Sequence, residues 1–148
     1  MLKRWLLIGI IPFVLLLDQV SKVWVMRRLA LGEAWMIWPG VLHLTHVNNT
    51  GAAFGILKGS GIILTVVSVI CVAGLAVYVA EAFIKNLTSM RSLAGGLVIA
   101  GAIGNLVDRV RYGYVIDFID FRVWPVFNIA DVSICTGVGL IAIVLLKK

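Results

Sequence analysis

Three aspartates fall close together in a chain that is otherwise rich in apolar residues. They are Asp108, Asp117 and Asp131. A carboxylate in or beside a lipid bilayer is expensive to keep there, so such a residue usually marks a functional site. This cluster is therefore the first candidate for a catalytic centre.

Asp117 and Asp131 are the stronger candidates, because neither has a cation at helical spacing that would explain it. Apolar residues flank Asp117, and Asn128 precedes Asp131 by three positions, where it could hydrogen-bond the carboxylate. Two carboxylates in a low-dielectric site cannot both ionise easily, so one keeps its proton at neutral pH. One member can then activate a water while the other protonates the carbonyl oxygen. Amide hydrolysis needs this chemistry and requires no metal.

Two other polar pairs favour supporting roles. Asp18 and Lys22 are four residues apart with the acid first, the favourable order for a helical ion pair. We expect them to support the site or contact a substrate. Asp108 is followed by Arg109, with Asn105 one turn earlier, a pattern typical of a local polar knot that closes a helix. We expect a structural role there and not catalysis.

Metal and serine chemistry have less support. The only histidines, His43 and His46, lie in a different connection from the aspartates and have no Cys or His-x-x-x-His pattern beside them. Cys71 and Cys135 fall in apolar stretches, where a thiol behaves as a small apolar group. A Gly-x-Ser-x-Gly element is absent. We expect neither a metal nor another cofactor.

The composition is that of an integral membrane protein. Of 148 residues, 61% are hydrophobic and only 14% are charged, and the mean hydropathy is +1.08. Four stretches are long enough to cross a bilayer as helices, at about residues 5–26, 61–83, 92–110 and 128–146. We therefore expect an all-α membrane protein with four transmembrane helices and a single domain over residues 1–148.

Two other protein classes fit the composition less well. The first apolar stretch is too long for a cleaved signal peptide, carries Asp18 and Lys22, and lacks a small-residue cleavage pattern. The net charge of +6 comes from basic residues placed singly or in pairs at helix ends. That placement indicates membrane anchoring and not nucleic-acid binding.

An even number of spans places both termini on one side of the membrane and the polar cluster on the other. The connections at 27–60 and 111–127 belong to the side of the cluster. Lys and Arg are densest in the short segments on the side of the termini, which favours cytoplasmic termini and a site near the outer leaflet. The polar residues gathered at the outer ends are Asp18, Lys22, Asn105, Asp108, Asn128 and Asp131.

The two outer connections are expected to lie along the membrane surface. Residues 41–47 alternate weakly in polarity after a Pro-Gly turn and predict a small β element. The connection at 111–127 is typical of a loop or a short surface helix. Indole rings prefer the headgroup layer, and four tryptophans belong to this face: Trp24, Trp35, Trp38 and Trp124.

Small residues predict how the last two spans pack. A stripe with a four-residue period along the third span lets a neighbouring helix approach closely, and Asp108 continues this stripe into the bundle. In the fourth span Asp131 shares a face with Asn128, Cys135 and Gly139, which predicts that Asp131 also points into the bundle. The members of the stripe are Ser92, Gly96, Ala100, Gly104 and Asp108.

Five motifs, in this order, resemble the bacterial lipoprotein signal peptidase family, also called signal peptidase II, over essentially the whole chain. They are DQVSK at 18–22, NTGAAF at 49–54, GNLVDR at 104–109, VIDF at 115–118 and FNIAD at 127–131. The resemblance implies an aspartic endopeptidase of the bacterial cytoplasmic membrane. Such an enzyme cleaves prolipoprotein signal peptides immediately before a cysteine that carries a diacylglyceryl group.

The resemblance also implies roles for residues. The catalytic pair maps onto Asp117 and Asp131. One departure is Val132, which stands where a serine commonly follows the second aspartate; a possible hydrogen bond is lost, but both carboxylates remain. The implied partners are lipid-modified prolipoproteins and membrane lipid, with no nucleic acid, and we expect a monomer. The residues implied to shape the site and hold substrate are Asp18, Lys22, Asn49, Gly51, Gly101, Gly104, Asn105, Asp108, Arg109, Asn128 and Ala130.

Two other functional classes stay open on the residues alone. A proton- or ion-coupled carrier would place ionisable groups at several depths, whereas here they gather near one face. A membrane protein that only binds a ligand would tolerate Asp→Asn changes at Asp117 and Asp131, if hydrogen bonding and not charge held the ligand.

Overall fold

The computed structural model describes residues 2–51, 61–84 and 89–146. Helices lie at all four predicted places: α1 at Leu2–Arg28, α2 at Gly61–Ile84, α3 at Ser89–Tyr112 and α4 at Ile129–Leu146. Among the described residues, three segments are long and apolar enough to cross a membrane: Gly9–Arg28, Ser89–Tyr112 and Ile129–Leu146. In α2 the described residues give a shorter apolar segment, Thr65–Gly74, so a fourth span stays a prediction.

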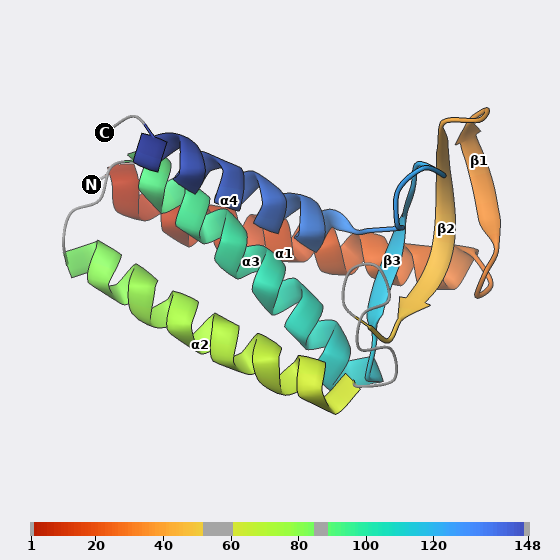
Figure 1. The fold of residues 1–148 in the computed structure, drawn as a ribbon, viewed down its shortest axis with the longest axis horizontal. Coiled ribbons are helices and arrows are strands. Elements are labelled where there is room, and N and C mark those ends of the chain that lie inside the picture. The colour runs from red at the N-terminus through yellow and green to blue at the C-terminus, as the bar shows by residue number, and fades with distance from the viewer. Residues whose placement is uncertain (1, 52–60, 85–88, 147–148) are drawn as a thin grey trace.

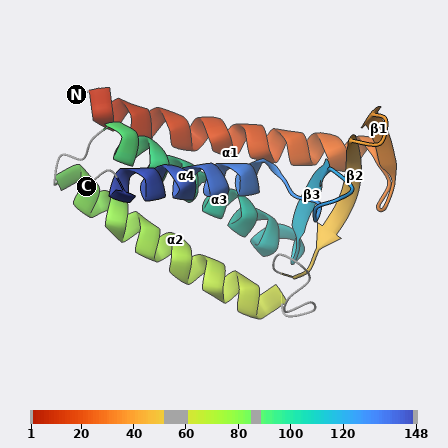
Figure 2. The ribbon, with the colours of Figure 1, turned by 45° about the horizontal axis from the view of Figure 1, so that its top comes forward.

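Helix α3 is the centre of the bundle and packs against each of the other three helices. In Figure 2, α3 and α4 lie between α1 and α2. Figure 1 shows the start of α1 and the end of α4 at one end of the bundle, with the strands at the opposite end. Polar residues near the end of α1, the end of α3 and the start of α4 are therefore brought to the strand end.

The predicted stripe of small residues is the packing face of α3. Its five members, from Ser92 to Asp108, are all buried. A Cβ atom at Gly101 would collide with the backbone oxygen of Ala130, and one at Gly104 would lie 2.6 Å from Oδ2 of Asp18. Only glycine lets α3 come this close to α4 and α1 at these two positions.

The prediction for the packing face of α4 was wrong. Cys135 and Gly139 are exposed, and the buried side chains of α4 are Ala130 and Ser133, with Gly137 on the same face. A Cβ at Gly137 would lie 2.6 Å from Cγ2 of Val98, so this glycine sets the contact with α3. Asp131 is half-buried and lies at the edge of that contact.

Three antiparallel strands form a sheet in the order β1-β2-β3: Ala34–Trp38, Leu42–Asn49 and Val115–Asp120. The β element predicted at residues 41–47 is thus confirmed as part of β2. The prediction of a loop or surface helix at 111–127 was wrong for β3, because Val115 to Phe118 are buried without alternation. A strand covered on both sides lacks the two-residue polarity pattern by which sequence reveals an amphipathic strand.

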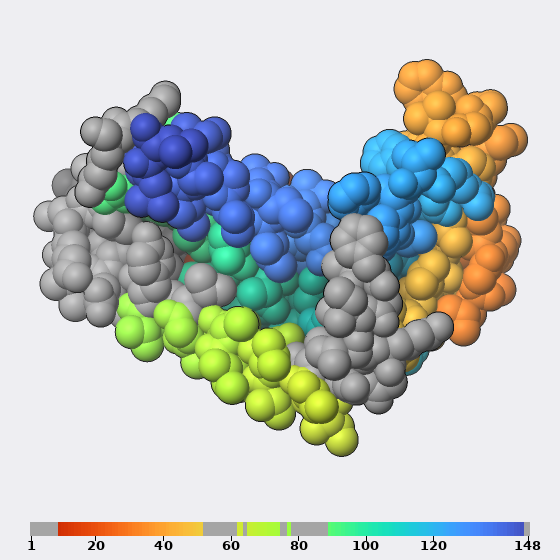
Figure 3. Space-filling model, in the orientation of Figure 1, coloured from red at the N-terminus to blue at the C-terminus, as the bar shows by residue number. Residues whose placement is uncertain are grey.

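The sheet is fixed to the bundle through β3 and projects away from it at β1. Phe118 packs with Val25 and Leu29 at the end of α1, and Ile119 and Ile129 join this apolar cluster. Every residue of β1 is exposed, and the β1–β2 end stands away from the helices in Figure 3. The strand that carries Asp117 is thus the part of the sheet held most firmly against the helices.

Candidate active site

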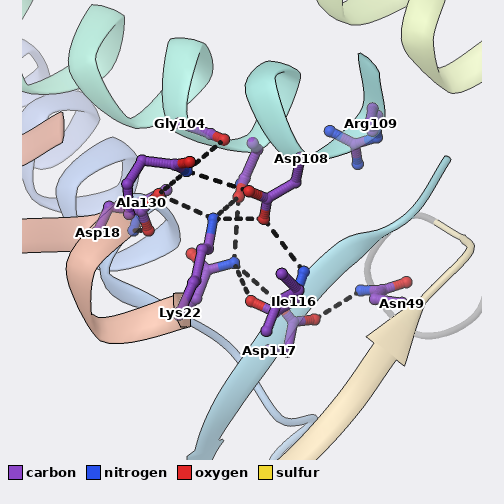
Figure 4. A network of polar contacts seen from close by, with 12 residues as sticks. Asp18, Lys22, Asn49, Gly104, Asp108, Arg109, Ile116, Asp117 and Ala130 are labelled. Atoms are coloured by element: carbon purple, nitrogen blue, oxygen red, sulfur yellow. Dashed lines mark hydrogen bonds and ion pairs between the residues drawn. The ribbon is translucent and has the colours of Figure 1, made fainter. Parts of the chain in front are cut away.

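Asp117 is buried in the middle of β3, with 2% of its surface exposed. Its strand neighbours are apolar, as the sequence predicted, but its partners come from other elements. Asn49 at the end of β2 donates from Nδ2 to Oδ2 (2.8 Å), and Asn128 donates from Nδ2 to Oδ1 (2.7 Å). Gly51 donates its backbone N–H to Oδ1 of Asn49, which turns the amide of Asn49 toward the acid (Figure 4).

Asp131 is the third residue of α4 and belongs to the cap of that helix. Its backbone N–H donates to Oδ1 of Asn128 (2.9 Å), and the N–H of Asn128 donates back to Oδ2 of Asp131 (3.2 Å). This is a reciprocal capping pair, as the three-residue spacing predicted. Asn105 of α3 donates from Nδ2 to Oδ1 (2.8 Å). A carboxylate here is also favoured by the positive end of the helix dipole.

Asn128 joins the two acids. Its side chain binds Asp117, its backbone N–H binds Asp131, and its Nδ2 also lies 3.1 Å from Oδ1 of Asn105. The residue is completely buried, so its amide is fixed in place. The two carboxylates, from a strand and a helix, are therefore held by one asparagine.

The environment favours a proton on Asp117. Burial, and next the negative charge of Asp131, raise the pKa of Asp117 from 3.8 to about 7, against the opposing effect of the amides of Asn49 and Asn128. Near neutral pH the carboxyl group is then protonated in roughly half of the molecules. A pair with one shared proton can supply an acid and a base at once.

Both acids line a cavity of about 790 Å³. Its walls come from the end of β2, the end of α3, strand β3, the segment before α4, and α4 itself. Asn49, Gly51, Asn105 and Arg109 are among the predicted site residues that line it. Apolar or weakly polar residues make up much of the rest of the wall: Val47, Val115, Trp124, Pro125, Val126, Phe127, Val132, Ile134, Cys135 and Thr136.

A buried cation, Lys22, is linked to the second acid through other polar residues. Nζ of Lys22 lies 2.9 Å from Oδ2 of Asp18, 2.8 Å from Oδ2 of Asp108 and 3.1 Å from Oδ1 of Asn105. The predicted pair within α1 is therefore present, and it extends to α3 (Figure 4). Because Asn105 also binds Asp131, the cation is one hydrogen-bonded residue away from the second acid.

Asp108 and Asp18 tie this cluster to the strand and to α4. Asp108 accepts a hydrogen bond from the N–H of Ile116 (3.2 Å), the residue before Asp117. These contacts join separate parts of the fold, and the cation of Asp108 is Lys22 of another helix and not the neighbouring Arg109. Asp18 accepts from the N–H of Ala130 (3.0 Å), so a residue of α1 caps α4.

Sequence reasoning gave no role to Gln19, which binds both supporting acids. Its Nε2 lies 3.1 Å from Oδ2 of Asp18, 3.0 Å from Oδ1 of Asp108 and 3.3 Å from the backbone oxygen of Gly104. The side chain thus joins α1 to α3 beside the buried cation. No spacing rule could have found this link, because its two partners in α3 lie 85 and 89 positions away.

The histidines are not part of the cavity. Both belong to β2, and Nδ1 of His46 binds the backbone oxygen of Leu29 at 3.0 Å. Over residues 2–51, 61–84 and 89–146, no cluster of three His, Cys, Asp or Glu side chains is arranged to hold a metal ion.

Known proteins resemble this chain in sequence and structure. Residues 10–147 match the family model of signal peptidase (SPase) II. The lipoprotein signal peptidase of Halothermothrix orenii is 44% identical over 140 residues, covering 94% of each chain. That of Pelotomaculum thermopropionicum is 45% identical over 138 residues, covering 93% of this chain and 90% of the relative.

Two solved structures, each described as a bacterial membrane enzyme, have the same fold. One superposes with a TM-score of 0.85 at 38% identity and covers 95% of this chain and 87% of its own. The other has a TM-score of 0.83 at 38% identity and covers 96% and 93%. A small sheet at one end of a helical bundle therefore belongs to a fold already seen in membrane enzymes.

Proposed function

The chain belongs to the signal peptidase II family, and we propose that it removes signal peptides from lipoprotein precursors with Asp117 and Asp131 as its catalytic pair. The observation that carries the proposal is the pair of acids, held by one asparagine at the wall of one cavity. The raised pKa of Asp117 supports an acid role for this residue. Asp131 is then the base.

In the first step Asp131 takes a proton from a water while the water oxygen attacks the scissile carbonyl carbon. The electrons of the carbonyl double bond move to its oxygen, which receives the proton of Asp117. The product of this step is a neutral tetrahedral diol, and the single negative charge of the pair has moved from Asp131 to Asp117.

In the second step the bond between the carbonyl carbon and nitrogen breaks. The nitrogen takes the proton that Asp131 had received, and a hydroxyl of the diol returns its proton to Asp117 as the carbonyl re-forms. The signal peptide leaves with a new carboxyl terminus, and the mature lipoprotein leaves with a free amino group. Both acids regain their starting protonation.

The other site residues are proposed to orient these groups. Asn49, Asn105 and Asn128 hold the two carboxylates through their amides. Arg109 lines the cavity and is proposed to bind a substrate carbonyl, while Gly51 lets the substrate backbone come close. The remaining residues hold helices and strand in place: Asp18, Lys22, Gly101, Gly104, Asp108 and Ala130.

The apolar wall of the cavity suits a substrate that is half lipid. We propose that cleavage occurs immediately before a diacylglyceryl-modified cysteine, with the acyl chains in the membrane beside the cavity. The exposed apolar side chains of β1 and the loop at Trp124 are proposed to lie in the outer headgroup layer. The termini would then be cytoplasmic, and a monomer carries the complete site.

The acid role of Asp117 predicts how activity depends on pH. A raised pKa means that the catalytic proton is present at acid and neutral pH and is lost as pH rises through about 7. We expect kcat/KM for a diacylglyceryl-modified precursor peptide to fall about tenfold per pH unit above about pH 8. The measurement is cleavage rate against pH in detergent. Constant kcat/KM up to about pH 10 would contradict the assignment of the acid.

A further inference from the structure

Arg109 is a cation among carboxylates that is not paired with any of them. The charges nearest to it are those of Asp131, Asp117 and Asp108, and its side chain is half-buried at the cavity wall. Lys22 pairs with Asp18 and Asp108, and Arg122 pairs with Asp120, whereas Arg109, within the described part of the chain, is in no ion pair with these acids. Figure 4 shows its guanidinium apart from the dashed network.

What holds Arg109 is a hydroxyl from another helix. Nη1 of Arg109 donates to Oγ of Ser68 at 3.2 Å, across 41 positions of sequence. Ser68 lies in α2, whose main contact in the bundle is α3, the helix of Arg109. Hydrogen bonds that involve a charged group are stronger than those between neutral groups, so this contact restrains a long and otherwise flexible side chain.

Holding the Arg109 side chain in place matters because a released guanidinium could pair with the two proposed catalytic acids. A guanidinium forms bidentate pairs with carboxylates readily. If Arg109 paired with Asp117 or Asp131, it would favour the ionised form of that acid. The pair would then lose its shared proton, and the cavity would lose a donor for a substrate carbonyl.

We propose that Ser68 is a positioning residue that, through its hydrogen bond to Arg109, holds the guanidinium in the cavity and away from the two acids. The proposal rests on the function proposed above, because it assigns Arg109 to the substrate and Asp117 and Asp131 to the chemistry. The proposed effect of Ser68 on the two acids is indirect and passes through Arg109.

The first test is the pH profile of Ser68→Ala. The charged groups that face Asp117 are Asp131 of α4, Lys22 of α1 and, once released, Arg109 of α3. We expect kcat/KM at neutral pH to fall about tenfold, the size of one hydrogen bond to a charged group. The fall of kcat/KM at alkaline pH, called the alkaline limb below, should also begin at lower pH. Ser68→Thr keeps the hydroxyl and should retain the wild-type limb.

A matched control is Ser133→Ala. Oγ of this buried serine donates to the backbone oxygen of Leu97 at 2.7 Å and links α4 to α3 without touching Arg109. Its loss should lower the unfolding temperature in detergent and leave the alkaline limb where it is. If Ser68→Ala leaves the limb unmoved, as Ser133→Ala should, the proposal is overturned.

The second test asks whether Ser68 acts through Arg109. Ser68→Ala, Arg109→Gln and the double variant form a double-mutant cycle. We expect Ser68→Ala to have no further effect on kcat/KM or on the limb in the Arg109→Gln background. Additive losses would show that Ser68 acts by another route. An inactive wild type on the same substrate would instead refute the proposed function, so the two failures are distinguishable.

Discussion

Asp117→Asn and Asp131→Asn should each reduce signal-peptide cleavage at least about 1,000-fold, within the range of losses caused by removing an acid or a base that acts in the transition state. An amide cannot take the proton of the water in place of Asp131 or give a proton to the carbonyl oxygen in place of Asp117. Each carboxylate accepts two hydrogen bonds, one on each oxygen. An amide has one oxygen and one NH2 group, so one of the two hydrogen-bond donors would face another donor. The fold should tolerate this, at a cost of about 1–3 kcal/mol.

Asp120→Asn is the matched control. Asp120 is also a buried carboxylate of β3, three positions from Asp117, and accepts from Thr45 Oγ1 (2.7 Å) and the N–H of Arg122 (2.8 Å). It does not line the cavity. Single-turnover cleavage by the three purified variants should therefore separate Asp120→Asn, near wild type, from the other two. Near-normal rates for either catalytic variant would refute the aspartate pair.

Lys22→Met should destabilise the protein by roughly 3–5 kcal/mol, the usual cost of removing one partner from a buried ion pair. Lys22 has 1% of its side chain exposed and lies between Asp18 and Asp108, which are equally buried. Without the ammonium, two carboxylates repel each other in a low-dielectric interior. The measurement is unfolding in detergent, followed by circular dichroism.

A triple variant separates charge from packing. Adding Asp18→Asn and Asp108→Asn to Lys22→Met removes the uncompensated charges, so more than half of the lost stability should return. The Lys22→Met change also removes a partner of Asn105, which orients Asp131, so activity should fall even where the protein stays folded. A change of less than about 1 kcal/mol on Lys22→Met would contradict the account of this cluster.

Much of the site could be predicted because its residues are costly in a membrane. Asp117, Asp131 and Asn128 stood out by type, and the three-residue spacing of Asn128 and Asp131 is a local geometric rule that the helix cap obeys. The Asp18–Lys22 pair follows a rule of the same kind. The order of the five motifs indicated the family, and the match of residues 10–147 to the family model confirms it.

What could not be predicted depends on contacts between distant parts of the chain. Strand β3 is buried on both faces, so its sequence carries no alternation. The face of α4 that packs against α3 depends on the close approach of Gly137 to Val98. Polarity alone favoured the face that carries Cys135. Gln19 and Ser68 are ordinary helix residues in sequence. Their partners are set by how α1 and α2 pack against α3.

The most direct test of the central claim is cleavage of a diacylglyceryl-modified lipoprotein precursor by the detergent-purified wild-type protein, with and without a chelator. Release of the signal peptide is followed by gel shift, and the product termini by mass spectrometry. We expect chelator-resistant cleavage immediately before the lipidated cysteine, and loss of cleavage in Asp117→Asn and Asp131→Asn. Absence of cleavage by a well-folded wild type, or cleavage that the chelator abolishes, would contradict a metal-free aspartate peptidase.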